Sequence, residues 1–155
     1  MRRAEVFIIE DNKSKLRELK GALPDSLEYG ILETHSIAQA YRPLENRRWD
    51  LIILDMTFQV SLGAGNDIEK EALAGVEILQ FISRKRIGVP VIVATQHTNF
   101  FSRITPGIDS IEKLDALLAK AFPRNYVATV HVDLAGEAWK GRFQAEVLRA
   151  LGASV

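Results

Sequence analysis

The fold of this chain follows from the stretch Val6-Phe7-Ile8-Ile9-Glu10-Asp11, in which four apolar residues run directly into two acids. An apolar run without alternation predicts a strand that is covered on both faces, as in a parallel sheet enclosed by helices. A weaker strand is expected at residues 29–34. The remaining three predicted strands are residues 51–54, 89–94 and 126–132, which lead into Asp55, Thr95 and Asp133.

Apolar residues at helical spacing fill the segments between these strands. Leu16, Leu19 and Leu23 form the first stripe, and the second begins at Ile37, where Pro43 is expected to kink or end the helix. The other three stripes are residues 76–82, 111–122 (starting near Asp109 or Ser110 and stopping before Pro123) and 139–151. Strand and helix thus alternate five times, which predicts one domain over residues 1–155 with a (βα)5 doubly wound, parallel five-stranded sheet.

One connection is longer than the 2–6 residues usual between a strand and its helix. It covers about residues 59–74 and contains Gly63 and Gly65 among several charged residues. We expect an extended loop here, partly helical around residues 67–73. Loops of this length are often functional.

Composition narrows the classes of function. Twenty basic residues balance twenty acidic ones, which gives no long-range attraction to nucleic acid or to an anionic membrane. No cysteine is present, and no apolar segment approaches the roughly 20 residues that span a bilayer. The start of the chain does not resemble a signal peptide. We therefore expect a cytoplasmic domain that binds neither nucleic acid nor membrane.

Acidic residues gather where the predicted strands end. Ligands of open parallel sheets bind beyond the carboxyl ends of the strands, where Glu10, Asp11, Asp55 and Thr95 would meet. Clustered carboxylates favour a hard cation such as Mg²⁺, and Thr95 adds a hydroxyl donor. The alternative is a structural role for these residues, because Asp and Asn after a strand often cap the next helix, and Asp11 or Asn12 could be such a cap.

These motifs together resemble the receiver domain of response regulators, a flavodoxin-like fold. The resemblance lies in the acid pair after residues 6–9, in Asp55 after residues 51–54, in residues 75–79 and in residues 89–95, and it covers about residues 4–96. It implies that Glu10, Asp11, Asp55 and the backbone carbonyl of Thr57 bind Mg²⁺. It also implies that Asp55 accepts phosphate from a histidine kinase or phosphotransfer protein, and that Thr95 is the switch residue.

The sequence departs from the family in four places. The strand at 126–132 ends without the lysine that contacts the phosphoryl group, and the sequence does not show which residue replaces it. Lys120 mimics that motif but lies in a helical stripe, which predicts a solvated side chain. Gln96 replaces a small residue and could cover Asp55. Gln59 replaces a proline, and the following loop is unusually long.

These features leave three functions open. The first is a non-enzymatic signalling receiver that is phosphorylated at Asp55 and regulates a downstream protein in trans. The sequence also leaves open whether this receiver forms a homodimer. The second is a pseudo-receiver that binds partners without phosphorylation. The third is an aspartate-based phosphatase, which is disfavoured because Thr57 stands where those enzymes place a second acid. His97 lies near the predicted pocket, where it would tune access or simply occupy a surface loop.

Overall fold

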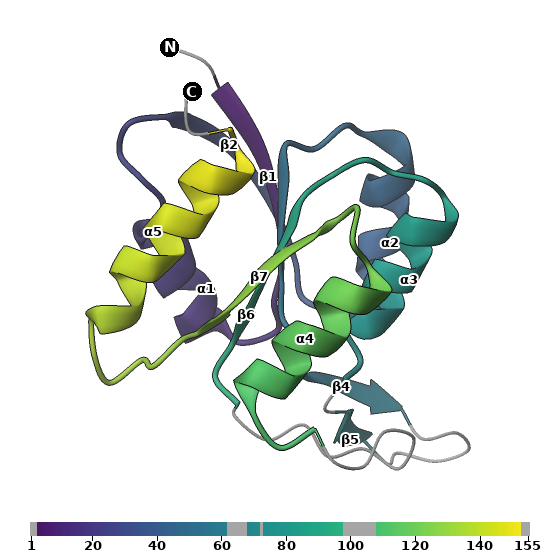
Figure 1. The fold of residues 1–155 in the computed structure, drawn as a ribbon. Coiled ribbons are helices and arrows are strands. Elements are labelled where there is room, and N and C mark those ends of the chain that lie inside the picture. Colours follow the sequence, from purple (N-terminus) through teal and green to yellow (C-terminus); the bar gives the residue numbers. More distant parts are fainter. Residues whose placement is uncertain (1–2, 62–67, 72, 98–107, 153–155) are drawn as a thin grey trace.

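A computed structural model describes residues 3–61, 68–71, 73–97 and 108–152 of the chain. Five parallel strands form one sheet in the order β2-β1-β3-β6-β7 (Figure 1). Their bounds are Arg3–Ile9 for β1, Glu28–Thr34 for β2, Leu51–Leu54 for β3, Val91–Thr95 for β6 and Tyr126–His131 for β7. The predicted doubly wound parallel sheet is therefore confirmed.

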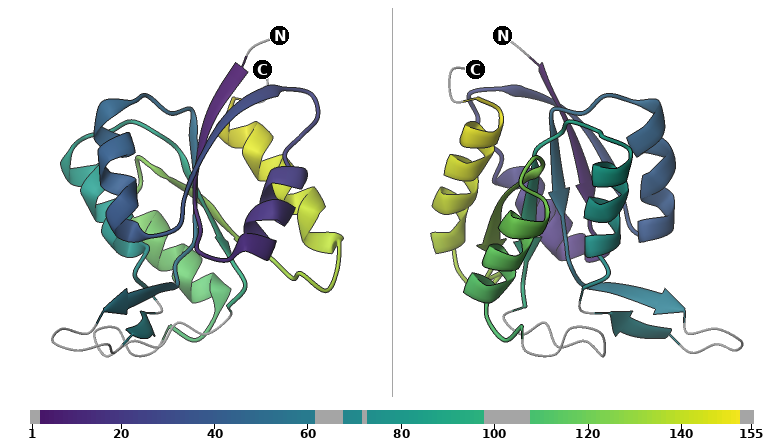
Figure 2. Two further views of the ribbon diagram at one scale, coloured as in Figure 1. Left: turned by 180° about the vertical axis from the view of Figure 1, so that it is seen from behind. Right: turned by 45° about the vertical axis from the view of Figure 1, so that its right-hand side comes forward.

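Helices cover both faces of the sheet (Figure 2). Two of them, α1 and α5, pack on one face, while α2, α3 and α4 pack on the other. Their bounds are Lys13–Gly21 for α1, Ile37–Asn46 for α2, Val76–Arg84 for α3, Ile111–Ala121 for α4 and Ala138–Ala150 for α5. Ser110 caps α4 by accepting a hydrogen bond from the Lys113 backbone N–H at 3.1 Å, as the sequence predicts.

The core divides into two layers because side chains alternate along each strand. In β1, Phe7 and Ile9 face the layer formed with α2, α3 and α4, whereas Val6 and Ile8 face the layer formed with α1 and α5. All four side chains are completely buried. This explains why residues 6–9 of β1 are continuously apolar instead of alternating.

Two local expectations need correction. Of the two outcomes expected at Pro43, a kink or an end of the helix, the end is wrong, because α2 continues to Asn46. The Pro43 carbonyl accepts hydrogen bonds from the Trp49 side chain at 3.0 Å and from the Arg47 backbone N–H at 3.2 Å. The strand expected at residues 89–94 begins only at Val91, because Pro90 has no backbone N–H for the ladder.

The long connection after β3 contains strands where we expected a loop with some helix. Phe58–Ser61 (β4) and Ile68–Glu71 (β5) pair antiparallel as a separate two-stranded sheet. The helical expectation for residues 67–73 is therefore wrong over β5, while residues 62–67 and 72 lie outside the described part of the chain. The strand pair projects from the end of the main sheet at which β3 finishes (Figures 1 and 2).

Candidate functional site

Two neighbouring strands carry acids at the edge where both end. β1 and β3 pair in parallel with Ile9 opposite Leu54, so Glu10 and Asp55 leave the sheet side by side. The chain direction across the sheet reverses here, since β2 lies on one side of β1 and β3 on the other. Such a switch point is where open parallel sheets bind their ligands.

Glu10, Asp11 and Asp55 form a carboxylate cluster at this edge. One oxygen from each residue lies within 4.8 Å of the others. Glu10 is only 1% exposed and Asp55 5%, while Asp11 is half-buried. Asn12 caps α1, because its Oδ1 accepts a hydrogen bond from the Lys15 backbone N–H at 3.0 Å. The helix cap is therefore Asn12 and not one of the clustered acids.

A buried lysine from the first turn of α1 lies inside this cluster. Lys15 Nζ is 2.5 Å from Glu10 Oε1 and 3.2 Å from Asp55 Oδ1, and the lysine side chain is 1% exposed. Backbone groups hold the same two acids: Asn12 N–H donates to Glu10 Oε2 at 3.1 Å, and Met56 N–H donates to Asp55 Oδ1 at 2.8 Å. One ammonium and two backbone donors thus fix both carboxylates.

The cluster attracts cations. Burial raises the pKa of Glu10, the Lys15 ammonium opposes that rise, and the Asp55 carboxylate adds to it. With three carboxylates and one ammonium ionised, the group would carry a net charge of −2. A positive charge at the cluster therefore stabilises the ionised form of Glu10.

A narrow cavity opens onto the cluster. It provides about 20 Å³ of space, which is enough for roughly one water molecule. Its lining residues come from the ends of β1, β3 and β6 and from the start of α1: Glu10, Asp11, Asn12, Lys15, Asp55, Thr57, Gln96 and His97. The free space beside the cluster is therefore limited, and Gln96 and His97 are among the side chains that border it.

The structure places the other residues singled out in the sequence as follows. Thr95 is completely buried at the end of β6, and its Oγ1 accepts a hydrogen bond from the His97 backbone N–H at 3.1 Å. Thr95 is not among the residues that line the cavity, whereas half-buried Gln96 and exposed His97 are. Thr57 is buried. Lys120 is exposed on α4, as predicted.

The donor set suits Mg²⁺ chemically. Mg²⁺ prefers carboxylate and carbonyl oxygens at about 2.0–2.1 Å, which places opposite ligands about 4 Å apart. The 4.8 Å limit that encloses the three carboxylate oxygens is slightly wider than this. Glu10, Asp11 and Asp55 could therefore hold the ion after a small inward movement.

Comparison with known proteins identifies the fold. No protein-family model matches the chain. An uncharacterized protein, y4jR, from Sinorhizobium fredii (strain NBRC 101917 / NGR234) is 28% identical over 140 residues, which cover 88% of this chain and 91% of that protein. A signal receiver domain from Vibrio parahaemolyticus has 21% identity and a TM-score of 0.58, over 96% of this chain and 93% of that one.

A second solved structure agrees. The signal receiver domain of a two-component signal transduction (histidine kinase) protein from Clostridium thermocellum has 18% identity and a TM-score of 0.62, over 96% of this chain and 98% of that one. This chain has the receiver fold. Within the described part of this receiver fold, no helix is both long and apolar enough to cross a membrane.

Lys15 is the residue of this receiver fold that sequence reasoning missed. The last strand of the sheet, β7, ends at exposed His131, whose Nε2 lies 3.1 Å from the Gln96 carbonyl oxygen. The ammonium that reaches the acid cluster comes instead from Lys15, near the opposite end of the chain. Lys15 lies four residues before Leu19, so it shares a helix face with the core stripe. A lysine on that face, one turn after an acid pair, is the signal that the sequence carries.

The receiver fold brings Gly75 against the loop that carries Asp55. A Cβ at Gly75 would overlap the Asp55 carbonyl oxygen and lie 2.7 Å from Met56 Cε. Gly75→Ala is therefore expected to lower the free energy of unfolding by about 1–3 kcal/mol, measured by urea denaturation. Gly141→Ala is the matched control, because a Cβ in that part of α5 meets nothing within 4 Å. It should raise stability by up to about 1 kcal/mol, and equal effects at both glycines would refute the packing argument.

Proposed function

We propose that this chain is a receiver-type signalling domain in which Asp55 accepts a phosphoryl group. The observation that carries the proposal is the meeting of Glu10, Asp11 and Asp55 at the switch point of a receiver-type sheet, with the Lys15 ammonium 3.2 Å from Asp55. The carboxylates would hold a divalent cation, and that cation together with the fixed ammonium would offset the negative charge of a phosphoryl group transferred onto Asp55. The unit would be a single domain over residues 1–155.

In this proposal each residue has a defined task. Asp55 supplies the carboxylate oxygen that forms the new bond to phosphorus, while the bond from phosphorus to the donor breaks and the leaving group keeps the electron pair. Glu10, Asp11, Asp55 and the backbone carbonyl of Thr57 would hold Mg²⁺, which offsets the negative charge of the arriving group. Buried Thr95 would respond as the switch residue, and Gln96 and His97 would control entry.

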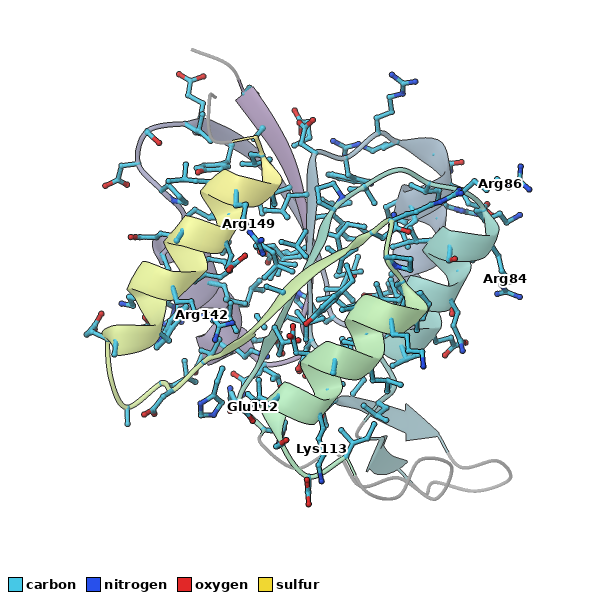
Figure 3. The ribbon with its side chains drawn as sticks, in the orientation of Figure 1. Arg84, Arg86, Glu112, Lys113, Arg142 and Arg149 are labelled. Carbon is cyan, nitrogen blue, oxygen red and sulfur yellow. The ribbon has the colours of Figure 1, made fainter. Side chains whose placement is uncertain are left out.

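The phosphoryl donor would be a histidine kinase or a phosphotransfer protein, and the output a contact with a downstream protein in the cytoplasm. We place that contact on the face formed by α4, β7 and α5. Figure 3 shows charged side chains there, with Glu112 and Lys113 on α4 and Arg142 and Arg149 on α5. Arg149 also donates a hydrogen bond to the carbonyl of Val127 in β7 at 3.3 Å, which ties α5 to the strand.

A second candidate is a pseudo-receiver that binds a partner without phosphorylation. It is favoured by the size of the cavity, about 20 Å³, and by the 5% exposure of Asp55. Gln96 lines that cavity and would cover the acid in this candidate. The two candidates differ in whether the cavity opens when a phosphoryl group is offered.

Titration with beryllofluoride, which mimics a phosphoryl group, distinguishes the two candidates. With Mg²⁺ present, we expect beryllofluoride to bind saturably to the wild-type chain. ¹⁹F NMR measures this binding. Asp55→Asn should weaken this binding at least about tenfold, because the carboxylate that coordinates beryllium is lost. Asp133→Asn is the matched control, since Asp133 is an exposed acid just after β7 at the same end of the sheet, and it should leave binding unchanged. Absence of binding to the wild-type chain would favour the pseudo-receiver.

A further inference from the structure

Lys15 lies between two of the carboxylates that would hold a bound cation. Its Nζ lies between Glu10 Oε1 at 2.5 Å and Asp55 Oδ1 at 3.2 Å, distances that suit an ammonium ion pair. A metal ion at about 2.0–2.1 Å would draw the same oxygens closer together. The carboxylate cluster thus already has a cation, the Lys15 ammonium, between two of its members.

The position of Lys15 is set by the fold around it. The helix that carries it is anchored by Leu16 and Leu19, which are buried against the sheet, and begins at the Asn12 cap. The lysine side chain is 1% exposed, so its charge is not solvated by bulk water. A buried ammonium needs anionic partners, and Glu10 and Asp55 supply them.

We propose that Lys15 is an internal cation that competes with a divalent metal for Glu10 and Asp55. Metal binding at the cluster then requires the ammonium to give up at least one carboxylate. With all three carboxylates ionised, removing the Lys15 charge changes the net charge of the cluster from −2 to −3 and leaves both oxygens without their ammonium partner. The affinity for Mg²⁺ should consequently rise. The inference deepens the proposed function, since it concerns the same site, but its test does not involve phosphorylation.

The test is isothermal titration of Mg²⁺ into the full chain and its variants. Lys15→Met should bind Mg²⁺ at least about tenfold more tightly than the wild-type chain, because a like charge next to the ion is removed. Lys20→Met is the matched control, because Lys20 lies on the same helix but forms an exposed ion pair with Glu33 of β2, and it should leave the affinity unchanged. Equal or weaker Mg²⁺ binding by Lys15→Met would overturn the proposal.

A second variant covers the case in which Lys15→Met does not fold. Lys15→Gln lacks the charge but keeps an N–H donor for Glu10, and the same rise in affinity is expected. Glu10→Gln combined with Lys15→Gln should abolish that rise, and a rise that persists would place the metal elsewhere and refute the inference. If beryllofluoride fails to bind the wild-type chain while the Mg²⁺ result holds, phosphorylation of Asp55 is refuted but the role of Lys15 stands.

Discussion

Lys15→Met is expected to lower the free energy of unfolding by about 3–5 kcal/mol, the usual cost of removing one partner of a buried ion pair. Lys15 is 1% exposed and pairs with Glu10, which is itself 1% exposed. Without the ammonium, two buried carboxylates would face each other with no cation between them. Methionine is similar in length, so little of the loss would come from a cavity. Urea denaturation at pH 8 with a chelator present measures the effect.

Two further variants test whether the loss of stability is specific to the buried ion pair. Lys20→Met removes an exposed pair, Lys20 Nζ to Glu33 Oε2 at 2.9 Å, and should cost no more than about 1 kcal/mol. Adding Glu10→Gln to Lys15→Met should restore part of the lost stability, because it removes one of the unpaired charges. A loss for Lys15→Met no larger than that for Lys20→Met would contradict the structural placement of Lys15.

Phe7→Ala is expected to destabilise the fold by about 3–5 kcal/mol, as for other buried phenylalanines replaced by alanine. The ring is completely buried in β1 and stacks on Trp49 with centroids 5.0 Å apart. β1 lies between β2 and β3 and leads into Glu10, so the same change loosens the strand that presents the acid cluster. Thermal or urea unfolding followed by circular dichroism measures the loss.

Leu117→Ala is the control for this core substitution. Leu117 lies on α4 with 40% of its surface exposed, and its replacement should change stability by about 0.5 kcal/mol or less. Comparable losses at Phe7 and Leu117 would mean that β1 is not the centre of the core. Trp49 fluorescence offers a second readout, because the stacked ring beside it disappears only in Phe7→Ala.

Local patterns explain why much of the architecture could be predicted. The apolar run Leu51–Leu54 has no polar face that could be exposed to solvent, so it is expected to form a strand that is buried on both faces. Parallel strands then place their carboxyl ends together, which predicted that Glu10 and Asp55 meet although 44 residues lie between them along the chain. The pair of β4 and β5 escaped prediction, because β5 is mostly charged and the sequence between the two strands contains Gly63 and Gly65, a composition typical of a loop.

The amino-acid sequence by itself determined the alternation of strands and helices and the acids at the strand ends, because both depend on neighbours within a few residues. Only the tertiary structure decided that the cation among those acids is Lys15. A charged side chain is buried only where partners from other segments compensate for lost hydration, and here those partners follow β1 and β3. The width of the cavity above Asp55 was likewise decided by packing, since Gln96 and His97 reach it from the end of a third strand, β6.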